Sequence, residues 1–294
     1  MPANLSNAPA DMDRVGVIGA GTMGAGIAHV AAAAGFETYL HDVTPSLLER
    51  GMARISADIE RGFSKGKTSR EEASAILARI STHPTLESLA SCSLVIEAVI
   101  EDAGVKRDIF NRLGSALSPA AILATNTSSL SVTSLSAGIP GPGRFVGLHF
   151  FNPPIGMKLV EVVRGNGTAA ATVDAATAFV KRLGKVPVVT SDSPGFIVNR
   201  VARPFYLEAL RLLGEGVADP AQIDRIVRSV GGFRMGPFEL MDLIGIDVNL
   251  AVTKSVYEQT FGEPRFRPHV IQQQMVDAGR LGRKSGRGFF GYGE

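Results

Sequence analysis

Over the first two thirds of the chain, short runs of β-branched and other apolar residues alternate with amphipathic stretches. The pattern predicts an alanine-rich helix over residues 22–34, a helix from Pro45 to about Gly62, and a further helix capped by Ser69. Strands are predicted over residues 14–18, 36–41, 94–99, 122–125, 144–150 and 185–190. This alternation is typical of a parallel sheet with crossover helices.

The last third of the chain shows only helical periodicity. Ser193 and Pro194 are predicted to cap and open a helix that closes at Gly214. Further helices are predicted to open at Pro220 and Pro237, with Asp247 as the cap of a fourth and residues 268–278 as a fifth. We therefore predict an α/β domain over residues 1–190 and an all-α domain over residues 191–294.

The composition argues against several classes of protein. Hydrophobic residues make up 45% of the 294 residues and charged residues 20%, which is ordinary for a globular enzyme. No apolar run approaches the roughly 20 residues that cross a bilayer, so no membrane association is expected. The net charge of +2, with dispersed basic residues, gives no reason to expect a nucleic-acid partner.

Cysteine usage and the N-terminal residues suggest the compartment. Cys92 is the only cysteine, so neither an intrachain disulfide nor a cysteine-based metal site is expected. Residues 1–13 lack the basic start and the apolar stretch of a secretory signal. We predict a cytoplasmic protein without a bound metal.

A glycine-rich motif joins the first predicted strand to the first predicted helix. One glycine allows the tight turn, one lets the backbone approach a pyrophosphate, and one lets the helix pack on its strand. The helix N-terminus offers N–H groups and partial positive charge to phosphates. The pattern predicts a Rossmann-type dinucleotide-binding domain whose cofactor contacts include Gly19, Gly21, Thr22, Met23 and Gly24.

Asp42 follows the second predicted strand, 23 positions after Gly19. A carboxylate at this spacing accepts a hydrogen bond from the ribose 2′-hydroxyl and repels a 2′-phosphate. Residues 43–46 contain no arginine that could bind such a phosphate. Both observations favour NAD over NADP, although Asp42 could instead cap the next helix.

The segment HFFNPPIGMKLVEVV, residues 149–163, has two β-rich runs around a turn-forming centre. A fold-back centred on Ile155 places His149 opposite Glu161. A carboxylate on one imidazole nitrogen fixes the tautomer and leaves the other nitrogen to accept a proton. Such a pair could remove a hydroxyl proton during hydride transfer, or it could be an edge-strand histidine with a salt-bridge partner.

This segment resembles the signature of the short-chain L-3-hydroxyacyl-CoA dehydrogenases, and of the bacterial 3-hydroxybutyryl-CoA dehydrogenases in particular. Supporting motifs follow in the family's order: VGVIGAGTMGAGIA, NTSS at 126–129, SPGFIVNR at 193–200, MGPFE at 235–239 and LGRKSGRGF at 281–289. The resemblance covers nearly the whole chain and is loose only before about Met12 and over residues 61–85.

The resemblance implies that His149 is the general base and Glu161 its orienting partner. It implies that Ser128 and Asn199 hydrogen-bond the reacting oxygen or the thioester carbonyl. Taken alone, Ser128 could be a helix cap and Asn199 a satisfied buried amide. It further places Glu101 and Lys106 beside the nicotinamide and its ribose, with Asn126 close to the same edge.

Several charged residues can be interpreted either as structural or surface groups or as parts of the site. Glu101 and Lys106 could be surface charges on a strand-to-helix loop, and Glu97 is interpreted as structural. A basic run of Arg50, Arg54, Arg61, Lys65 and Lys67 could hold the phosphates of coenzyme A, with Arg54 and Lys65 as the named candidates, or could be a solvated face.

The residues and this resemblance together predict an enzyme that interconverts an L-3-hydroxyacyl-CoA and the 3-ketoacyl-CoA with NAD, and the resemblance implies substrates of short chain. A dehydrogenase of the same scaffold that acts on a free hydroxy acid or sugar acid is the alternative, and a catalytically idle NAD-binding protein is a second. The apolar content of the helical half, and the family, predict a homodimer, with a closed higher oligomer as the alternative.

Overall fold

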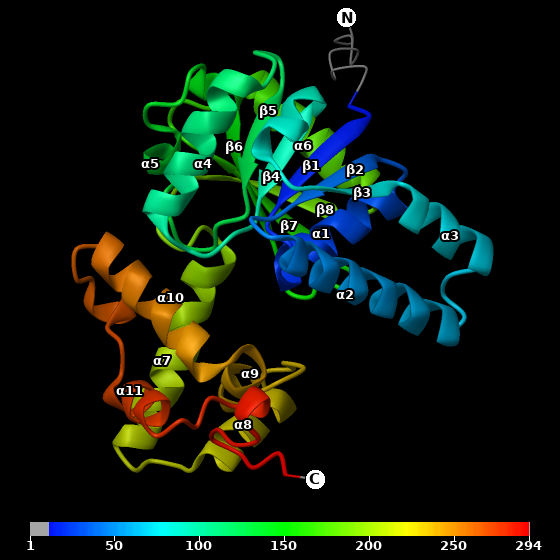
Figure 1. Cartoon of the computed structure of the whole chain (residues 1–294). Coiled ribbons are helices and arrows are strands. Elements are labelled where there is room, and N and C mark those ends of the chain that lie inside the picture. Colours follow the sequence, from blue (N-terminus) through cyan, green and yellow to red (C-terminus); the bar gives the residue numbers. More distant parts are fainter. Residues whose placement is uncertain (1–11, 294) are drawn as a thin grey trace, which may run out of the picture. The chain divides into compact units, whose positions relative to one another are not determined.

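The computed structural model of the protein describes residues 12–293. Its backbone contacts divide the chain into two compact units, Met1–Asp192 and Ser193–Glu294. The division lies two residues beyond the expected boundary at residue 190. Figure 1 shows a sheet-containing first unit and a helical second unit.

The first unit is built on one eight-stranded sheet in the order β3-β2-β1-β4-β5-β6-β7-β8. The strands are β1 (Arg14–Ile18), β2 (Glu37–His41), β3 (Ile80–His83), β4 (Leu94–Glu97), β5 (Ile122–Thr125), β6 (Phe145–Phe150), β7 (Leu159–Arg164) and β8 (Val186–Ser191). Strands β1 to β6 are parallel, β7 runs antiparallel to β6, and β8 pairs parallel with β7. The edge strand β3 was not predicted, because ISTH is short and mostly polar.

Helices cover both faces of this sheet (Figure 1). They are α1 (Thr22–Ala33), α2 (Pro45–Ser64), α3 (Arg70–Ala78), α4 (Ala103–Ala116), α5 (Val132–Ser136) and α6 (Ala170–Arg182), with short 3-10 helices η1 (Leu86–Ser91) and η2 (Pro142–Arg144). Val146 and Leu148 of β6 belong to the apolar core that α1 and α6 complete. Phe145 instead meets Phe110 of α4, with ring centroids 4.7 Å apart. The predicted cap of α3 is confirmed, since Ser69 forms a complete capping box.

The second unit is helical, as predicted: α7 (Val198–Gly214), α8 (Pro220–Ser229), α9 (Pro237–Ile244), α10 (Ile246–Gln259) and α11 (Val270–Asp277), with η3 (Pro264–Phe266) and η4 (Arg283–Ser285). The predicted start of α7 at Ser193 and Pro194 is wrong. Gly195 has φ 75° and Phe196 has φ 50°, so the chain passes through left-handed conformations that a right-handed helix excludes. The helix begins only after them.

Asp247 does not cap α10. Gly245 is the N-cap, and Asp247 lies in the first turn, 2.6 Å from Lys284 Nζ. A different carboxylate, the buried Asp242 on α9, binds the segment near the C-terminus. It accepts hydrogen bonds from the N–H groups of Phe289 and Phe290 and from the Tyr292 hydroxyl. Burial and this carboxylate raise the pKa of Tyr292 to about 12.

Candidate functional site

The predicted functional residues of the first unit gather at one edge of its sheet. Because β1, β2, β4, β5 and β6 run parallel, their carboxyl ends meet at the same edge. The connection from β1 goes outward to β2, whereas β4 lies on the other side of β1. Ligands of doubly wound sheets bind at such a reversal of strand order.

The glycine motif lies at this reversal, between β1 and α1. Gly19 has φ 97°, and a Cβ there would lie 2.6 Å from the carbonyl oxygen of Ala98. A Cβ on Gly24 would lie 1.7 Å from the carbonyl oxygen of Gly19. Larger residues would therefore displace the loop. The turn leads straight into α1, whose first N–H groups are available for an anion.

Asp42 lies beside this loop and binds it directly. Its Oδ2 accepts from the N–H of Ala20 at 2.7 Å, and its Oδ1 accepts from the N–H of Val43 at 2.7 Å. The alternative in which Asp42 caps α2 is wrong, because the N-cap is Thr44, whose hydroxyl accepts from the N–H of Leu47. The carboxylate is thus held against the glycine motif, at the end of β2.

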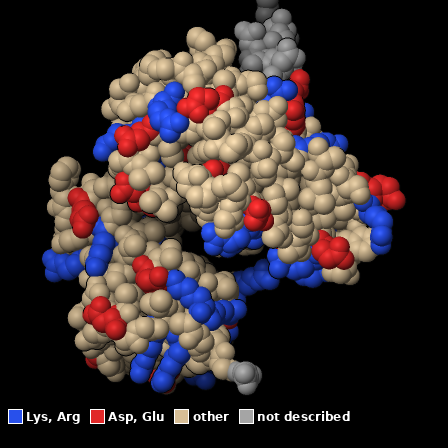
Figure 2. All heavy atoms as spheres, viewed as in Figure 1, with Lys and Arg blue, Asp and Glu red and all other residues tan. Residues whose placement is uncertain are grey.

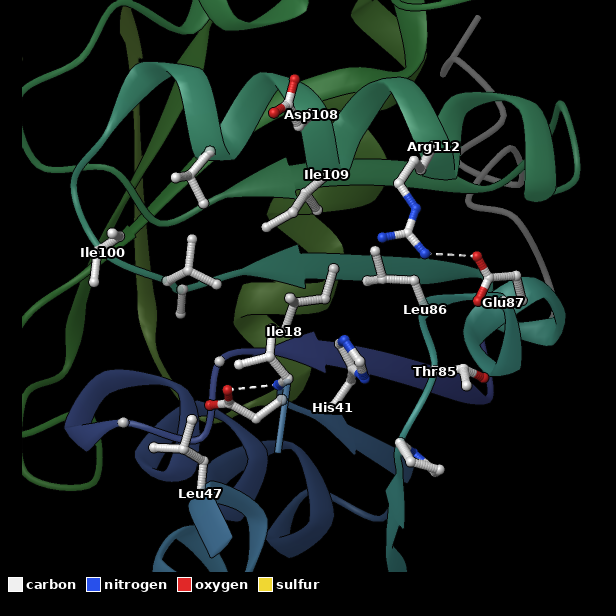
Figure 3. A pocket seen from close by; sticks show the side chains of 18 residues that line it. Ile18, His41, Leu47, Thr85, Leu86, Glu87, Ile100, Asp108, Ile109 and Arg112 are labelled. Atoms are coloured by element: carbon white, nitrogen blue, oxygen red, sulfur yellow. Dashed lines mark hydrogen bonds and ion pairs between the residues drawn. The ribbon is translucent and has the colours of Figure 1, made fainter. Parts of the chain in front are cut away.

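A pocket of about 760 Å³ extends from the glycine motif past Asp42 (Figure 3). Apolar side chains from the ends of several strands and from α4 line most of it, including Ile18, Val43, Leu86, Ile100 and Ile109. Arg112 and Glu87 form an ion pair of 2.8 Å at its border. A volume of this size suits a small-molecule or cofactor site.

The two basic residues proposed for coenzyme A lie far apart along α2. Arg54 Nη1 donates to Thr22 Oγ1 at 2.5 Å, which places this guanidinium at the glycine motif. Lys65 is the C-cap of the same helix. Eleven residues of helix separate them by roughly 16 Å, so they do not form one anion site.

The predicted hairpin is confirmed in register and in contact. His149 of β6 pairs with Glu161 of β7, and Nδ1 of the ring lies 2.7 Å from Oε2 of the carboxylate. His149 is 5% exposed and Glu161 is fully buried. The contact requires a proton on Nδ1 in the neutral ring, because a carboxylate only accepts. The neutral ring therefore presents Nε2 as its basic nitrogen.

Two other elements hold this hairpin. The amide oxygen of Asn126, after β5, accepts from the N–H of Phe150 at 2.9 Å. Lys185 Nζ donates to the carbonyl oxygens of Pro154 at 2.5 Å and Met157 at 2.7 Å, within the connection between β6 and β7. Burial lowers the pKa of Lys185. Sequence reasoning did not identify Lys185, because a lysine next to a glycine turn resembles any solvated residue.

A buried charge network lies beneath the loops after β4 and β5. Lys106 on α4 is 1% exposed, and its Nζ lies 2.6 Å from Glu97 Oε1 and 3.1 Å from Glu101 Oε2. Glu97 is fully buried and also accepts from the Thr125 hydroxyl at 2.7 Å. The interpretation of Lys106 as a surface charge is therefore wrong. Glu97, at the end of β4, is its buried ion-pair partner.

Glu101 carries this network to the predicted substrate loop. Its Oε1 accepts from the Thr127 hydroxyl at 2.5 Å and from the N–H groups of Ser128 and Ser129 at 2.9 and 3.1 Å. Desolvation by burial raises the pKa of Glu101. The Lys106 ammonium and these hydrogen bonds lower it by more, so the net pKa lies below the ordinary value. The reading of Ser128 as a helix cap is wrong, since Ser131 caps α5.

Asn199 belongs to the second unit, in the first turn of α7, where it is half-buried. Its backbone carbonyl accepts from Arg203 Nε at 3.2 Å. Arg203 is itself 2% exposed, and burial lowers its pKa to about 10. Apart from Lys65 at the far end of α2, the structure thus gathers the predicted residues of the first unit at one edge, and Asn199 belongs to the separate second unit.

The surface carries both signs of charge. On the visible face of each unit, acidic and basic side chains are interspersed (Figure 2). Among residues 12–293, no helix is long and apolar enough to span a membrane. The same residues contain no cluster of three or more side chains suited to hold a metal ion.

Comparison with known proteins identifies the family. Residues 14–193 match the family description "3-hydroxyacyl-CoA dehydrogenase, NAD binding domain", and residues 195–292 match "3-hydroxyacyl-CoA dehydrogenase, C-terminal domain". The chain belongs to the 3-hydroxyacyl-CoA dehydrogenase family. This confirms the predicted fold class, the NAD-dependent dehydrogenase class and NAD as the cofactor.

Individual proteins of this family are similar to the chain over most of its length. A 3-hydroxybutyryl-CoA dehydrogenase of Bradyrhizobium diazoefficiens is 45% identical over 95% of both chains. The structure of (S)-3-hydroxybutyryl-CoA dehydrogenase from Ralstonia eutropha has a TM-score of 0.93 and 38% identity, over 97% of this chain and 100% of that one. A 3-hydroxyadipyl-CoA dehydrogenase of Escherichia coli is 47% identical over 95% of this chain, which spans 59% of that relative's length.

The buried network of this dehydrogenase gives a stability prediction. Lys106→Met leaves the Glu97 carboxylate buried without its ammonium, and we expect a loss of about 3–5 kcal/mol in the free energy of unfolding. The double variant Glu97→Gln/Lys106→Met removes both charges and should recover part of that loss. Denaturant unfolding measures both, with the exposed neighbour Arg107→Met as the control. Equal stability of Lys106→Met and Arg107→Met would contradict the ion-pair assignment.

Proposed function

We propose that this dehydrogenase interconverts a short-chain L-3-hydroxyacyl-CoA and the corresponding 3-ketoacyl-CoA, with NAD as the hydride carrier. The observation that carries the proposal is the contact of 2.7 Å between His149 Nδ1 and Glu161 Oε2, in a buried hairpin of an NAD-binding domain. The finer assignment of His149 and Glu161 as the catalytic pair is part of this proposal.

In the direction of oxidation, His149 Nε2 accepts the proton of the 3-hydroxyl group. Glu161 stabilises the resulting imidazolium, because its carboxylate is buried and already bonded to Nδ1. In the reverse direction the imidazolium returns this proton to the carbonyl oxygen. Ser128 and Asn199 hydrogen-bond the reacting oxygen or the thioester carbonyl in this proposal.

NAD, when bound, supplies the hydride chemistry, and the chain supplies position and proton handling. We assign its pyrophosphate to Gly19, Gly21, Thr22, Met23 and Gly24, and its adenosine ribose to Asp42. The close approaches at Gly19 and Gly24 support this assignment. Glu101 and Asn126 border the nicotinamide side, and Lys106 acts through Glu101 because it is 1% exposed.

The substrate class comes from the names of the relatives. These names include 3-hydroxybutyryl-CoA and 3-hydroxyadipyl-CoA, which share the thioester and the 3-hydroxyl but differ at the end of the acyl chain. Lys65, at the exposed end of α2, is the basic residue that we retain for the coenzyme A phosphates. The contact of Arg54 with Thr22 instead supports a role for Arg54 beside the dinucleotide.

The first experiment is a turnover assay that follows absorbance at 340 nm. We expect rapid oxidation of NADH with acetoacetyl-CoA and little oxidation of NADPH at equal concentration, because Asp42 repels a 2′-phosphate. A parallel assay with 3-oxoadipyl-CoA compares the two thioester classes. Preference for NADPH would contradict the role of Asp42, and absence of turnover with either thioester would contradict the proposed substrate class.

The catalytic pair is tested by His149→Gln. Loss of the base should lower turnover of acetoacetyl-CoA by about 10²- to 10⁴-fold, the usual contribution of general acid–base catalysis. The dissociation constant of NADH, measured by its fluorescence, should stay nearly unchanged, because His149 is not among the residues that line the pocket beside the glycine motif and Asp42, where we assign the pyrophosphate and the adenosine. His83→Gln is the matched control on another strand. Retained turnover in His149→Gln would refute the assignment.

We also propose that the protein is a homodimer formed through its second unit. Large apolar side chains of that unit are more than half exposed: Val201, Val217, Ile226, Val230, Phe233, Phe261 and Val270. Apolar exposure of this extent is typical of an association surface. Sedimentation equilibrium at micromolar concentration should give twice the mass of the chain, and a monomer would contradict the proposal.

A further inference from the structure

His41 is a buried polar residue of the dinucleotide pocket that the proposed reaction does not use. It is the last residue of β2, directly before Asp42, and is 5% exposed. It lines the same pocket of about 760 Å³ as Asp42. Figure 3 shows its ring between Ile18 and Leu86.

Two hydrogen bonds fix this residue. Its backbone carbonyl accepts from the N–H of Gly19 at 2.8 Å, and its ring Nδ1 lies 2.8 Å from the carbonyl oxygen of His83. A carbonyl only accepts, so Nδ1 carries the proton of the neutral ring, and Nε2 is then an acceptor. Within residues 12–293, the Nδ1 contact is the one hydrogen bond that this ring forms.

The pocket around His41 corresponds to the base of the dinucleotide. The pyrophosphate belongs at the glycine motif, and the adenosine ribose belongs at Asp42. The adenine therefore continues beyond Asp42, where Val43, Ile100 and Ile109 offer apolar surface to its faces. His41 is the one imidazole among the residues that line this pocket, so it is the histidine that the polar edge of the base can meet.

We propose that His41 selects adenine by accepting a hydrogen bond from its exocyclic amino group. The ring nitrogens of adenine that remain after glycosidic attachment are acceptors, and the amino group is its hydrogen-bond donor. An Nε2 acceptor therefore has one complementary partner on the base. The inference rests on NAD binding, and it assigns to this chain a base-recognition residue beyond the glycine motif and Asp42.

The same geometry predicts which dinucleotide is disfavoured. A base that carries a carbonyl oxygen in place of the amino group presents an acceptor to His41 Nε2, which is itself an acceptor. A dinucleotide with such a base should therefore bind more weakly, and the difference should depend on the His41 ring.

The other charged or titratable groups around the ring can be separated from it. They are Asp42 beside it, Glu87 on η1, Asp108 and Arg112 on α4, and His83 on β3. Of these, His83 is the second histidine. Its ring does not line the pocket but stacks on Tyr39 with centroids 4.0 Å apart and bonds the Ser81 hydroxyl, and burial lowers its pKa. His83→Phe is therefore the matched control.

The test compares NADH with deamino-NADH, in which hypoxanthine replaces adenine. Dissociation constants are measured by dinucleotide fluorescence. For the wild type and for His83→Phe, we expect deamino-NADH to bind about fivefold more weakly than NADH, the net effect of one hydrogen bond.

In His41→Phe and His41→Leu the ratio of the two dissociation constants should be near one. A wild-type ratio near one overturns the proposal without any variant. A ratio that is unchanged in both His41 variants, or equally reduced in His83→Phe, overturns it as well. Binding of NADH itself, measured in the same titrations, reports separately on the cofactor assignment.

Discussion

The register of β6 against β7 is the constraint on which the candidate chemistry depends. Side chains alternate between the two faces of a sheet, so a shift of one residue would move Glu161 away from His149. The apolar alternation of both strands, with Val146 and Leu148 in the core beside α1 and α6, makes such a shift costly. The same alternation that buries the core thus turns His149 toward the other face, where its partner lies.

Polar side chains from other elements bind the backbone near the connection between β6 and β7, and so help to hold the register of the two strands. Asn126 holds the backbone of Phe150, and Lys185 holds two carbonyls of the intervening turn. A buried ammonium without an acidic partner is costly, and Lys185 is tolerated because carbonyl oxygens satisfy it. Glu97 and Lys106 hold the loops after β4 and β5 in a similar way. Lys106 pairs with Glu97 and Glu101, and Glu101 accepts hydrogen bonds from the N–H groups of Ser128 and Ser129.

Much of this arrangement could be predicted because short-range patterns specify it. The glycine motif, the hairpin, the cap of α3 and the start of α8 at Pro220 follow from residue types at fixed spacing, and the structure contains all of them. The start of α7 could not be predicted, because the left-handed conformation of Phe196 is not encoded by its residue type. The burial of Lys106 and Lys185 could not be predicted from the sequence either, because the residue type does not show which carbonyl or carboxylate groups the fold brings to the ammonium.

The end of β2 illustrates how local and distant constraints combine. The N–H of Gly19 binds the carbonyl of His41, and the N–H of Ala20 binds the carboxylate of Asp42, so the glycine motif and the strand end form one hydrogen-bonded unit. The loop that we propose for the pyrophosphate is thereby joined by hydrogen bonds to the two residues that we propose for the ribose and the base. In this proposal the end of one strand positions both side chains, and the loop sets their distance from the phosphates.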